Sequence, residues 1–254
     1  MSKGGDRALG LPRLHLRRTD STNNRARELA ARGAPHGTLV TAVEQTAGRG
    51  RQGRSWVAPP GSSLLCSLLV REWPRLLPLA TGVAVAETCD ALLAAAPPAA
   101  RVGERALIKW PNDVLLGQRK VAGILIEARP QDRWAVIGVG LNVALDPDML
   151  SAELRGRVGT LGLGPEAVEL ALTRLLERLE RWLEPTIDED ELLRAVRARD
   201  ALGGRAIAWQ GSRGRPGRGT VVGIGDDGAL LVETESGERL ALDGGEVHLL
   251  DGPC

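Results

Sequence analysis

The sequence predicts an α+β fold, in which a mixed, largely antiparallel sheet with flanking helices precedes a small C-terminal β-barrel. Three patterns predict it. Apolar runs over residues 120–127 and 134–144 are joined by a short loop, which is typical of two antiparallel strands. Segments with helical spacing lie on either side of this pair. Further along, short strands alternate with Gly-rich turns. We therefore expect one domain over residues 1–201 and a second over residues 202–254.

The N-terminal part begins with a polar cluster and an alanine-rich helix. Residues 19–24 read Thr-Asp-Ser-Thr-Asn-Asn, and residues 25–32 follow with helical spacing and end at Gly33. Ser, Thr and Asn are preferred helix N-caps, so capping accounts for one of these side chains. A helix N-terminus also binds anions and polar ligands, so capping together with ligand binding explains the cluster as well as capping alone.

The remaining elements are strands and helices with ordinary apolar patterns. Runs that are apolar throughout or at alternate positions predict strands, and leucine or alanine faces at helical spacing predict helices. In order, the predictions are strands at 38–43 and 63–70, a helix at 79–96, a turn at 99–105, two strands around a turn within 106–116, the strand pair described above, helices between 164 and 199, and strands at 205–208, 220–224, 229–233, 238–242 and 246–250.

Composition argues against several classes of function. A formal net charge of +1 over 254 residues does not suit a polyanion bound by bulk charge. The three cysteines are scattered, and no N-terminal apolar run resembles a signal peptide or a membrane span. We therefore expect a reduced, cytoplasmic protein with no membrane partner. The three histidines form no cluster and Cys-x-x-Cys is absent, so a metal site built by the protein alone is not expected.

Lysine and asparagine are scarce, which singles out those that remain. Only three of the 33 basic residues are lysine, and asparagine occurs four times. An ammonium group differs from a guanidinium, and an amide differs from a carboxylate or a hydroxyl, so these few residues are candidates for binding roles. Phe and Tyr are absent, so stacking on a base would fall to Trp or Arg.

The most informative stretch is residues 44–56, which read Glu-Gln-Thr-Ala-Gly-Arg-Gly-Arg-Gln-Gly-Arg-Ser-Trp. Glycines alternate with Arg49, Arg51 and Arg54, so a backbone able to approach a ligand closely carries three planar cations, which suit carboxylate and phosphate groups. The spacing also fits Gly-x-Gly-x-x-Gly. A dinucleotide site, however, needs a helix next, and the paired prolines at 59–60 forbid one. A solvated Arg-Gly loop without a ligand is the other interpretation.

A second candidate site lies at the turn within residues 106–116. The sequence Lys109-Trp-Pro-Asn-Asp113 places a lysine and a carboxylate there, and we interpret both as functional. The asparagine before Asp113 is better explained as an ordinary turn residue. Gly123 and Gly140 interrupt apolar strands, which indicates that another group lies close to the backbone at those points.

Six motifs, taken in order, resemble those of the biotin protein ligases, also called biotin–[acetyl-CoA-carboxylase] ligases. They are Asp20-Ser-Thr-Asn23, Glu44-Gln45, Gly48-Arg-Gly-Arg-Gln-Gly-Arg-Ser-Trp56, Lys109-Trp-Pro-Asn-Asp113, Lys120-Val-Ala-Gly-Ile-Leu-Ile-Glu127 and Gly138-Val-Gly-Leu-Asn142. The resemblance covers nearly the whole chain and implies that the small barrel is SH3-like. Only about eighteen residues precede Thr19, so a monofunctional ligase without an N-terminal DNA-binding domain is expected.

The resemblance implies an ATP-dependent ligase. The biotin carboxylate would attack the α-phosphate of ATP to give biotinyl-5'-AMP, and a lysine of a biotin carboxyl carrier protein would then accept the biotin. Mg²⁺ would accompany the phosphates, with Asp113 as a candidate ligand. Arg51 and Lys120 would be the catalytic residues. The resemblance assigns biotin binding to Ser21, Thr22, Asn23, Gln45, Arg49, Gly50, Arg51, Lys120 and Gly123, and ATP binding to Arg54, Trp56, Lys109, Asp113 and Asn142.

Two other functions stay open at this point. A lipoate or octanoate ligase or transferase would share the catalytic fold, but it would need a long apolar slot. An Arg-Gly-rich RNA-binding protein would use the basic stretch at 213–218, although no aromatic residue is interleaved there for base stacking. A homodimer is a further expectation, and a DNA partner is not expected.

Overall fold

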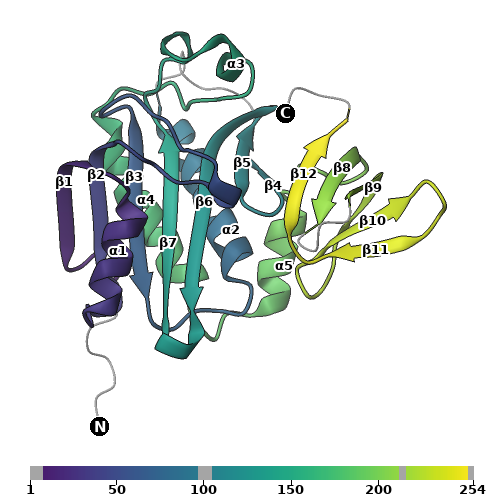
Figure 1. The fold of residues 1–254 in the computed structure, drawn as a ribbon, viewed down its shortest axis with the longest axis horizontal. Helices are drawn as coiled ribbons and strands as arrows, with labels where there is room; N and C mark the ends of the chain where they lie inside the picture. The colour runs from purple at the N-terminus through teal and green to yellow at the C-terminus, as the bar shows by residue number, and fades with distance from the viewer. Residues whose placement is uncertain (1–7, 97–104, 212–215, 251–254) are drawn as a thin grey trace.

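The computed structural model describes residues 8–96, 105–211 and 216–250, which form two sheets and their helices (Figure 1). The strands of the larger sheet are β1 (Arg13–Thr19), β2 (Leu39–Gln45), β3 (Ser63–Val70), β4 (Leu107–Lys109), β5 (Asp113–Leu116), β6 (Arg119–Arg129) and β7 (Trp134–Asn142). Their order is β1-β2-β3-β7-β6-β5-β4. Only β1 and β2 pair in parallel, and the other pairs are antiparallel, so the predicted mixed, largely antiparallel sheet is confirmed.

The edge strand β1 was not predicted. Its residues read Arg-Leu-His-Leu-Arg-Arg-Thr, and most of them are exposed. An edge strand has one neighbour, so the sequence pattern that burial imposes on an inner strand is weak there. The strand exists because Arg13 to Thr19 align with Leu39 to Gln45 of β2.

Helices cover both faces of the larger sheet (Figure 1). On one face, α1 (Thr22–Ala31) packs against β3 and β7. On the other face lie α2 (Leu77–Ala95) and α4 (Ala167–Trp182), and α5 (Glu189–Arg197) packs on α2. A short helix, α3 (Ala152–Arg155), follows β7. By length and composition α2 could cross a membrane, but 72% of its apolar window is buried inside the molecule. It is the central core helix.

The C-terminal part of the chain forms a separate five-stranded antiparallel sheet. Its strands are β8 (Ala206–Gly211), β9 (Pro216–Ile224), β10 (Leu230–Thr234), β11 (Arg239–Leu242) and β12 (Gly245–Leu249), in the order β11-β10-β9-β8-β12. All five correspond to predicted strands. The turn between β9 and β10 rests on the larger sheet, because the Trp110 indole N–H donates to the Gly228 carbonyl at 3.1 Å.

Two predictions fall partly outside the described residues. The turn at 99–105 and the basic stretch at 213–218 include residues 97–104 and 212–215, which the structure does not describe. The other predicted elements agree with the structure to within a few residues, and β3 matches its predicted bounds at both ends.

Candidate active site

Two cavities adjoin each other on the larger sheet, and residues 48–56, here called the clamp, lie where they meet. Figure 1 shows this segment, which follows β2, crossing in front of β7 and β6. The smaller cavity has a volume of about 110 Å³ and the larger one of about 470 Å³. The residues that line both are Arg54, Ser55, Trp56, Asn112 and Lys120.

The structure brings all the candidate site residues to these two cavities. The smaller cavity is lined by every residue assigned to biotin, namely Ser21, Thr22, Asn23, Gln45, Arg49, Gly50, Arg51, Lys120 and Gly123. The larger cavity is lined by every residue assigned to ATP, namely Arg54, Trp56, Lys109, Asp113 and Asn142. The individual roles of these residues stay predictions.

The clamp is a tight turn closed by its own backbone. The Gly50 N–H donates to the Arg54 carbonyl at 2.7 Å. At the tip, Gln52 has a φ of 54° and Gly53 a φ of 76°. Glycine adopts positive φ at little steric cost, so Gly53 suits this position. The turn therefore holds Arg51 in the wall of the smaller cavity and Arg54 where the two cavities meet.

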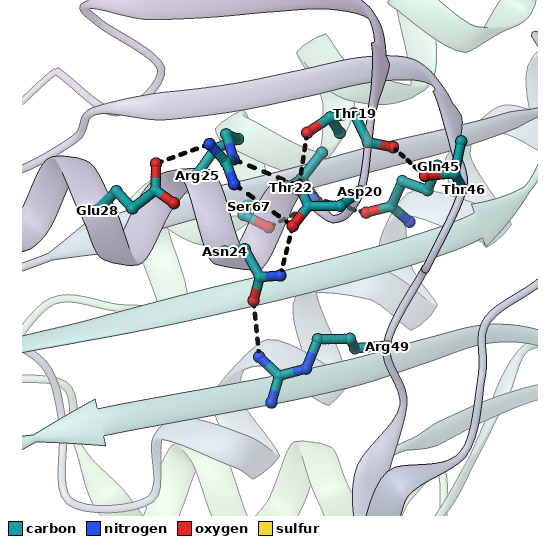
Figure 2. Close-up of polar contacts among 10 residues, drawn as sticks. All are labelled: Thr19, Asp20, Thr22, Asn24, Arg25, Glu28, Gln45, Thr46, Arg49 and Ser67. Atoms are coloured by element: carbon teal, nitrogen blue, oxygen red, sulfur yellow. Dashed lines mark hydrogen bonds and ion pairs between the residues drawn. The ribbon is translucent and has the colours of Figure 1, made fainter.

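The N-terminus of α1 is capped by another strand instead of by its own residues. Ser21 stands at the N-cap position, but its side chain makes no capping hydrogen bond, so the capping explanation is wrong for this residue. Instead, Gln45 Oε1 at the end of β2 accepts the Thr22 backbone N–H at 2.7 Å and the Thr22 hydroxyl at 3.0 Å (Figure 2). Ser67 Oγ lies 2.8 Å from Thr22 Oγ1. These contacts tie the helix start to β2 and β3.

Asn23 uses its amide inside the protein. It is 4% exposed, its Oδ1 accepts the Ser67 hydroxyl at 2.6 Å, and its Nδ2 donates to Glu127 Oε2 at 3.0 Å. A Cβ added at Gly138 would collide with Asn23 Oδ1, so this strand position requires glycine. Asn23 therefore fixes α1 against β6 and β7 in the wall of the smaller cavity.

Four cations line the smaller cavity, two of them also line the larger one, and they differ in their partners. Three of them have a carboxylate partner: Arg49 pairs with Glu127 at 3.1 Å, Arg54 with Glu246 at 2.6 Å, and Lys120 with Asp113 at 2.6 Å. The fourth, Arg51, donates through Nη1 to the amide oxygen of Asn112 at 3.2 Å. Within the described residues, Arg51 has no carboxylate at ion-pair distance.

The positive charge of Arg51 is therefore not neutralised, because its partner, the Asn112 amide, is uncharged. Burial lowers the pKa of Arg51 from its usual value, with a smaller opposing effect from Asp113. A guanidinium nevertheless stays protonated in proteins. An anion placed beside Arg51 would gain a charge-assisted hydrogen bond without first displacing a carboxylate from it.

Trp56 forms the floor between the two cavities. Its ring lies over the backbone of β6 and β7, where a Cβ added at Gly123 would stand 2.9 Å from the ring and one at Gly140 2.5 Å from it. This contact confirms the predicted close approach to both glycines. Lys120 Nζ lies 5.6 Å from the ring centroid. The indole Nε1 is buried against the sheet and has no hydrogen-bond partner among the described residues.

Replacing Gly140 by alanine should push the Trp56 ring away from the sheet. The added methyl would meet carbon atoms of a rigid indole, so we expect a loss of about 1–3 kcal/mol in unfolding free energy. We also expect weaker binding of any ligand that contacts Trp56. Urea unfolding and ligand calorimetry measure both effects. Gly156→Ala is the control, because a Cβ there meets nothing within 4 Å. Equal stability of the two variants would contradict the assigned contact.

Asn142 is more deeply engaged with the protein than its assignment to the nucleotide suggests. It is 2% exposed, its Nδ2 donates to the Gly159 carbonyl at 2.9 Å, and its Oδ1 accepts the Ser63 hydroxyl at 3.2 Å. In this arrangement Asn142 joins β3 and β7 to the segment after α3. It also lines the larger cavity.

Sequence reasoning missed several residues of the site. Asn112, interpreted as an ordinary turn residue, lines both cavities and accepts from Arg51. The carboxylates Glu127 and Glu246 hold clamp arginines, and Ser67 joins α1 to β3. The scarcity of asparagine could have pointed to Asn112. No sequence signal pointed to Glu246, which lies almost 200 residues from its partner.

In the part of the chain that the structure describes, no group of three or more His, Cys, Asp or Glu side chains could hold a metal ion. A metal at this site would therefore need ligands from a substrate as well as from the protein.

Comparison with known proteins agrees with this geometry. Residues 15–143 match the model of the biotin/lipoate A/B protein ligase family, and residues 202–250 match that of the biotin protein ligase C-terminal domain. A biotin–[acetyl-CoA-carboxylase] ligase of Paracoccus denitrificans is 37% identical, over 89% of this chain and 95% of its own. One from Mycobacterium tuberculosis is 34% identical, over 91% and 86%.

Among solved structures, the fold is similar to that of the biotin protein ligase from Aquifex aeolicus in complex with biotin and ATP. The TM-score is 0.73 and the sequences are 27% identical, with 93% of this chain and 97% of that one covered. Sequence and fold therefore agree over nearly the same length, and the chain belongs to the biotin protein ligase family.

Proposed function

We propose that this protein is an ATP-dependent ligase that activates biotin to biotinyl-5'-AMP and transfers it to a lysine of a biotin carboxyl carrier domain. One observation carries the proposal: four cations line the small polar cavity, two of them are shared with the larger cavity beside it, and one of the four has no carboxylate partner among the described residues. Such a junction suits two anionic reactants that must be held together against their mutual repulsion.

The reaction has two balanced steps. In the first, a biotin carboxylate oxygen forms a bond to the α-phosphorus of ATP, and the bond to the β-phosphate oxygen breaks, so pyrophosphate leaves. In the second, a carrier lysine amine attacks the carbonyl carbon of the mixed anhydride, AMP leaves, and the amine loses a proton. Neither step requires a covalent bond to the protein.

The cations act mainly on the first step. Arg51 would receive the biotin carboxylate, and Lys120, which lines both cavities, would contact the carboxylate and the α-phosphate. Charge that develops on the phosphate oxygens in the transition state would be stabilised by groups already in place. For this, Lys120 must exchange part of its contact with Asp113 for the ligand.

The other assigned residues would hold the two reactants. Thr22 and Gln45 lie at the polar end of the smaller cavity, where a ureido head group would find donors and acceptors. Trp56 and Lys109 line the larger cavity, where a nucleotide would lie. Asp113 is a hard oxygen donor that lines the larger cavity, and it would help to hold Mg²⁺ there. When bound, Mg²⁺ would neutralise phosphate charge.

The rival functions are less well supported. A lipoate or octanoate ligase needs an apolar slot, whereas the smaller cavity has hydroxyl, amide and guanidinium groups in its wall. An RNA-binding protein would not need two adjoining cavities for two small ligands.

The proposal includes three further points. The two domains divide near residue 202, the enzyme acts in the cytoplasm, and it binds neither DNA nor a membrane. A homodimer stays a prediction that sedimentation can test.

The decisive experiment is pyrophosphate release from ATP in the presence of biotin, lipoate or octanoate. We expect release with biotin alone, followed by biotin transfer when a biotin carboxyl carrier domain is added. Release with lipoate or octanoate but not with biotin would reassign the substrate. The absence of release with all three would refute the proposed function.

A further inference from the structure

The polar residues before and within the first turn of α1 form a chain of contacts that ends at the clamp. Figure 2 shows this cluster. Asn24 Nδ2 donates to Asp20 Oδ2 at 2.7 Å, and Asn24 Oδ1 accepts from Arg49 Nη1 at 3.0 Å. The contacts connect the segment before α1 with a cation of the smaller cavity, 25 residues along the chain from Asn24.

The chemistry of the two outer groups fixes the orientation of the amide between them. A carboxylate only accepts hydrogen bonds, so the Asn24 group that faces Asp20 must be the NH₂. A guanidinium only donates, so the group that faces Arg49 must be the carbonyl oxygen. Both partners demand the same orientation of Asn24. If the carboxylate were absent, the amide could rotate and present a donor to a donor.

Asp20 is built to remain a carboxylate. Its Oδ1 accepts from the Thr19 hydroxyl at 3.0 Å and lies 3.3 Å from Arg25 Nε. The hydrogen bond from Asn24 holds the pKa of Asp20 well below its usual range, and contacts with the Ser21 backbone, Thr19 and Arg25 act in the same direction. Asp20 is therefore charged at any pH at which the enzyme would work.

Arg49 is held from two sides through a single nitrogen. Its Nη1 donates to Asn24 and to both oxygens of Glu127, at 3.1 and 3.2 Å. Within the described residues its hydrogen bonds all use Nη1, which leaves Nε and Nη2 for a ligand in the smaller cavity that Arg49 lines. A guanidinium is planar, so fixing one nitrogen from two directions restricts the whole group.

We propose that Asp20 is a positioning residue for the clamp, which acts through Asn24 to hold the Arg49 guanidinium against the biotin site. This inference rests on the proposed function and deepens it by assigning roles to two residues outside the predicted set. Asp20 lines neither cavity. Its effect should therefore fall on biotin, which Arg49 contacts, and should leave ATP, which binds in the other cavity, nearly unaffected.

The test is a double-mutant cycle between positions 20 and 24, measured as biotin-dependent pyrophosphate release. Asp20→Ala and Asn24→Leu should each raise the KM for biotin about tenfold, as expected for a lost charge-assisted bond, and leave the KM for ATP within about twofold. The double variant should be no worse than Asn24→Leu alone, because Asp20 then has no amide to orient. Asp20→Asn keeps an acceptor oxygen and should recover most of the biotin KM.

Controls separate this role from a structural one. Glu28→Gln removes the other carboxylate partner of Arg25, at 2.8 Å, without touching Arg49, and should leave both KM values unchanged. Melting temperatures check folding, and Asp20→Ser replaces Asp20→Ala if the alanine variant is unstable. Wild-type enzyme without biotin-dependent release would refute the proposed function. Two results would refute this inference alone, provided that the wild-type enzyme shows biotin-dependent release. One is that the effects of the substitutions at positions 20 and 24 add up, and the other is that both KM values change equally.

Discussion

Replacing Arg51 by alanine should lower kcat/KM for biotin-dependent pyrophosphate release by about 10²–10³-fold. This is the range seen when one preorganised donor to a developing negative charge is removed. The effect should exceed that at Arg49 or Arg54, because both of those side chains already share their charge with a carboxylate. Adenylate that does form should leave the enzyme faster. Rapid filtration after a single turnover would measure its retention.

The control for this prediction is Gln52→Ala, one residue further along the clamp. Gln52 is exposed and lines neither cavity, and alanine tolerates its φ of 54° about as well as glutamine does. Arg51→Lys should recover little activity, since one ammonium group cannot copy a planar pair of donors. Wild-type turnover and retention by Arg51→Ala would show that Asn112, its partner at 3.2 Å, holds it in a purely structural role.

The second large effect is expected at Lys120. Lys120 is the only ammonium group among the four cations, and it lines both cavities. Lys120→Met removes it, so the rate of adenylation should fall by about 10²–10³-fold. Lys120→Arg should not restore it. Lys120 Nζ is a compact charge that stands 2.6 Å from Asp113 and 5.6 Å from the Trp56 ring centroid, and a planar guanidinium cannot place its charge in the same way. Steady-state pyrophosphate release with both variants measures this.

Arg119→Ala is the matched control, since Arg119 precedes Lys120 on β6 but is exposed and lines neither cavity. The binding of biotin alone, measured by calorimetry, should weaken less than turnover does, because Lys120 is assigned to the transition state. Full activity of Lys120→Arg would mean that only the charge matters. The rarity of lysine in this chain would then carry no functional information.

Elements whose residues are buried on all sides could be predicted closely from the sequence. β3 was predicted from Ser63 to Val70, and all eight of its residues are buried. In such a strand each side chain must be apolar or small, so the pattern is continuous. The same logic identified Gly123 and Gly140, since glycine in an apolar strand indicates close approach, and the Trp56 ring supplies it.

Elements and contacts that depend on distant partners could not be predicted. β1 is an exposed edge strand whose existence depends on β2. Glu246 carries no pattern of its own, and its pairing with Arg54 depends on how the C-terminal sheet docks. Asn112 has the ordinary sequence context of a turn, and only the position of Arg51 makes it part of the site.

The sequence by itself determined which chemical groups the site contains: a glycine-rich segment with three arginines, a rare lysine, and a hydroxyl and amide cluster before a helix. Only the tertiary structure decided which charges are paired and which is left for a ligand. The physical reason is distance. The energy of an ion pair depends on separations of a few ångströms, and these are set by strand register and sheet docking between residues far apart in the chain.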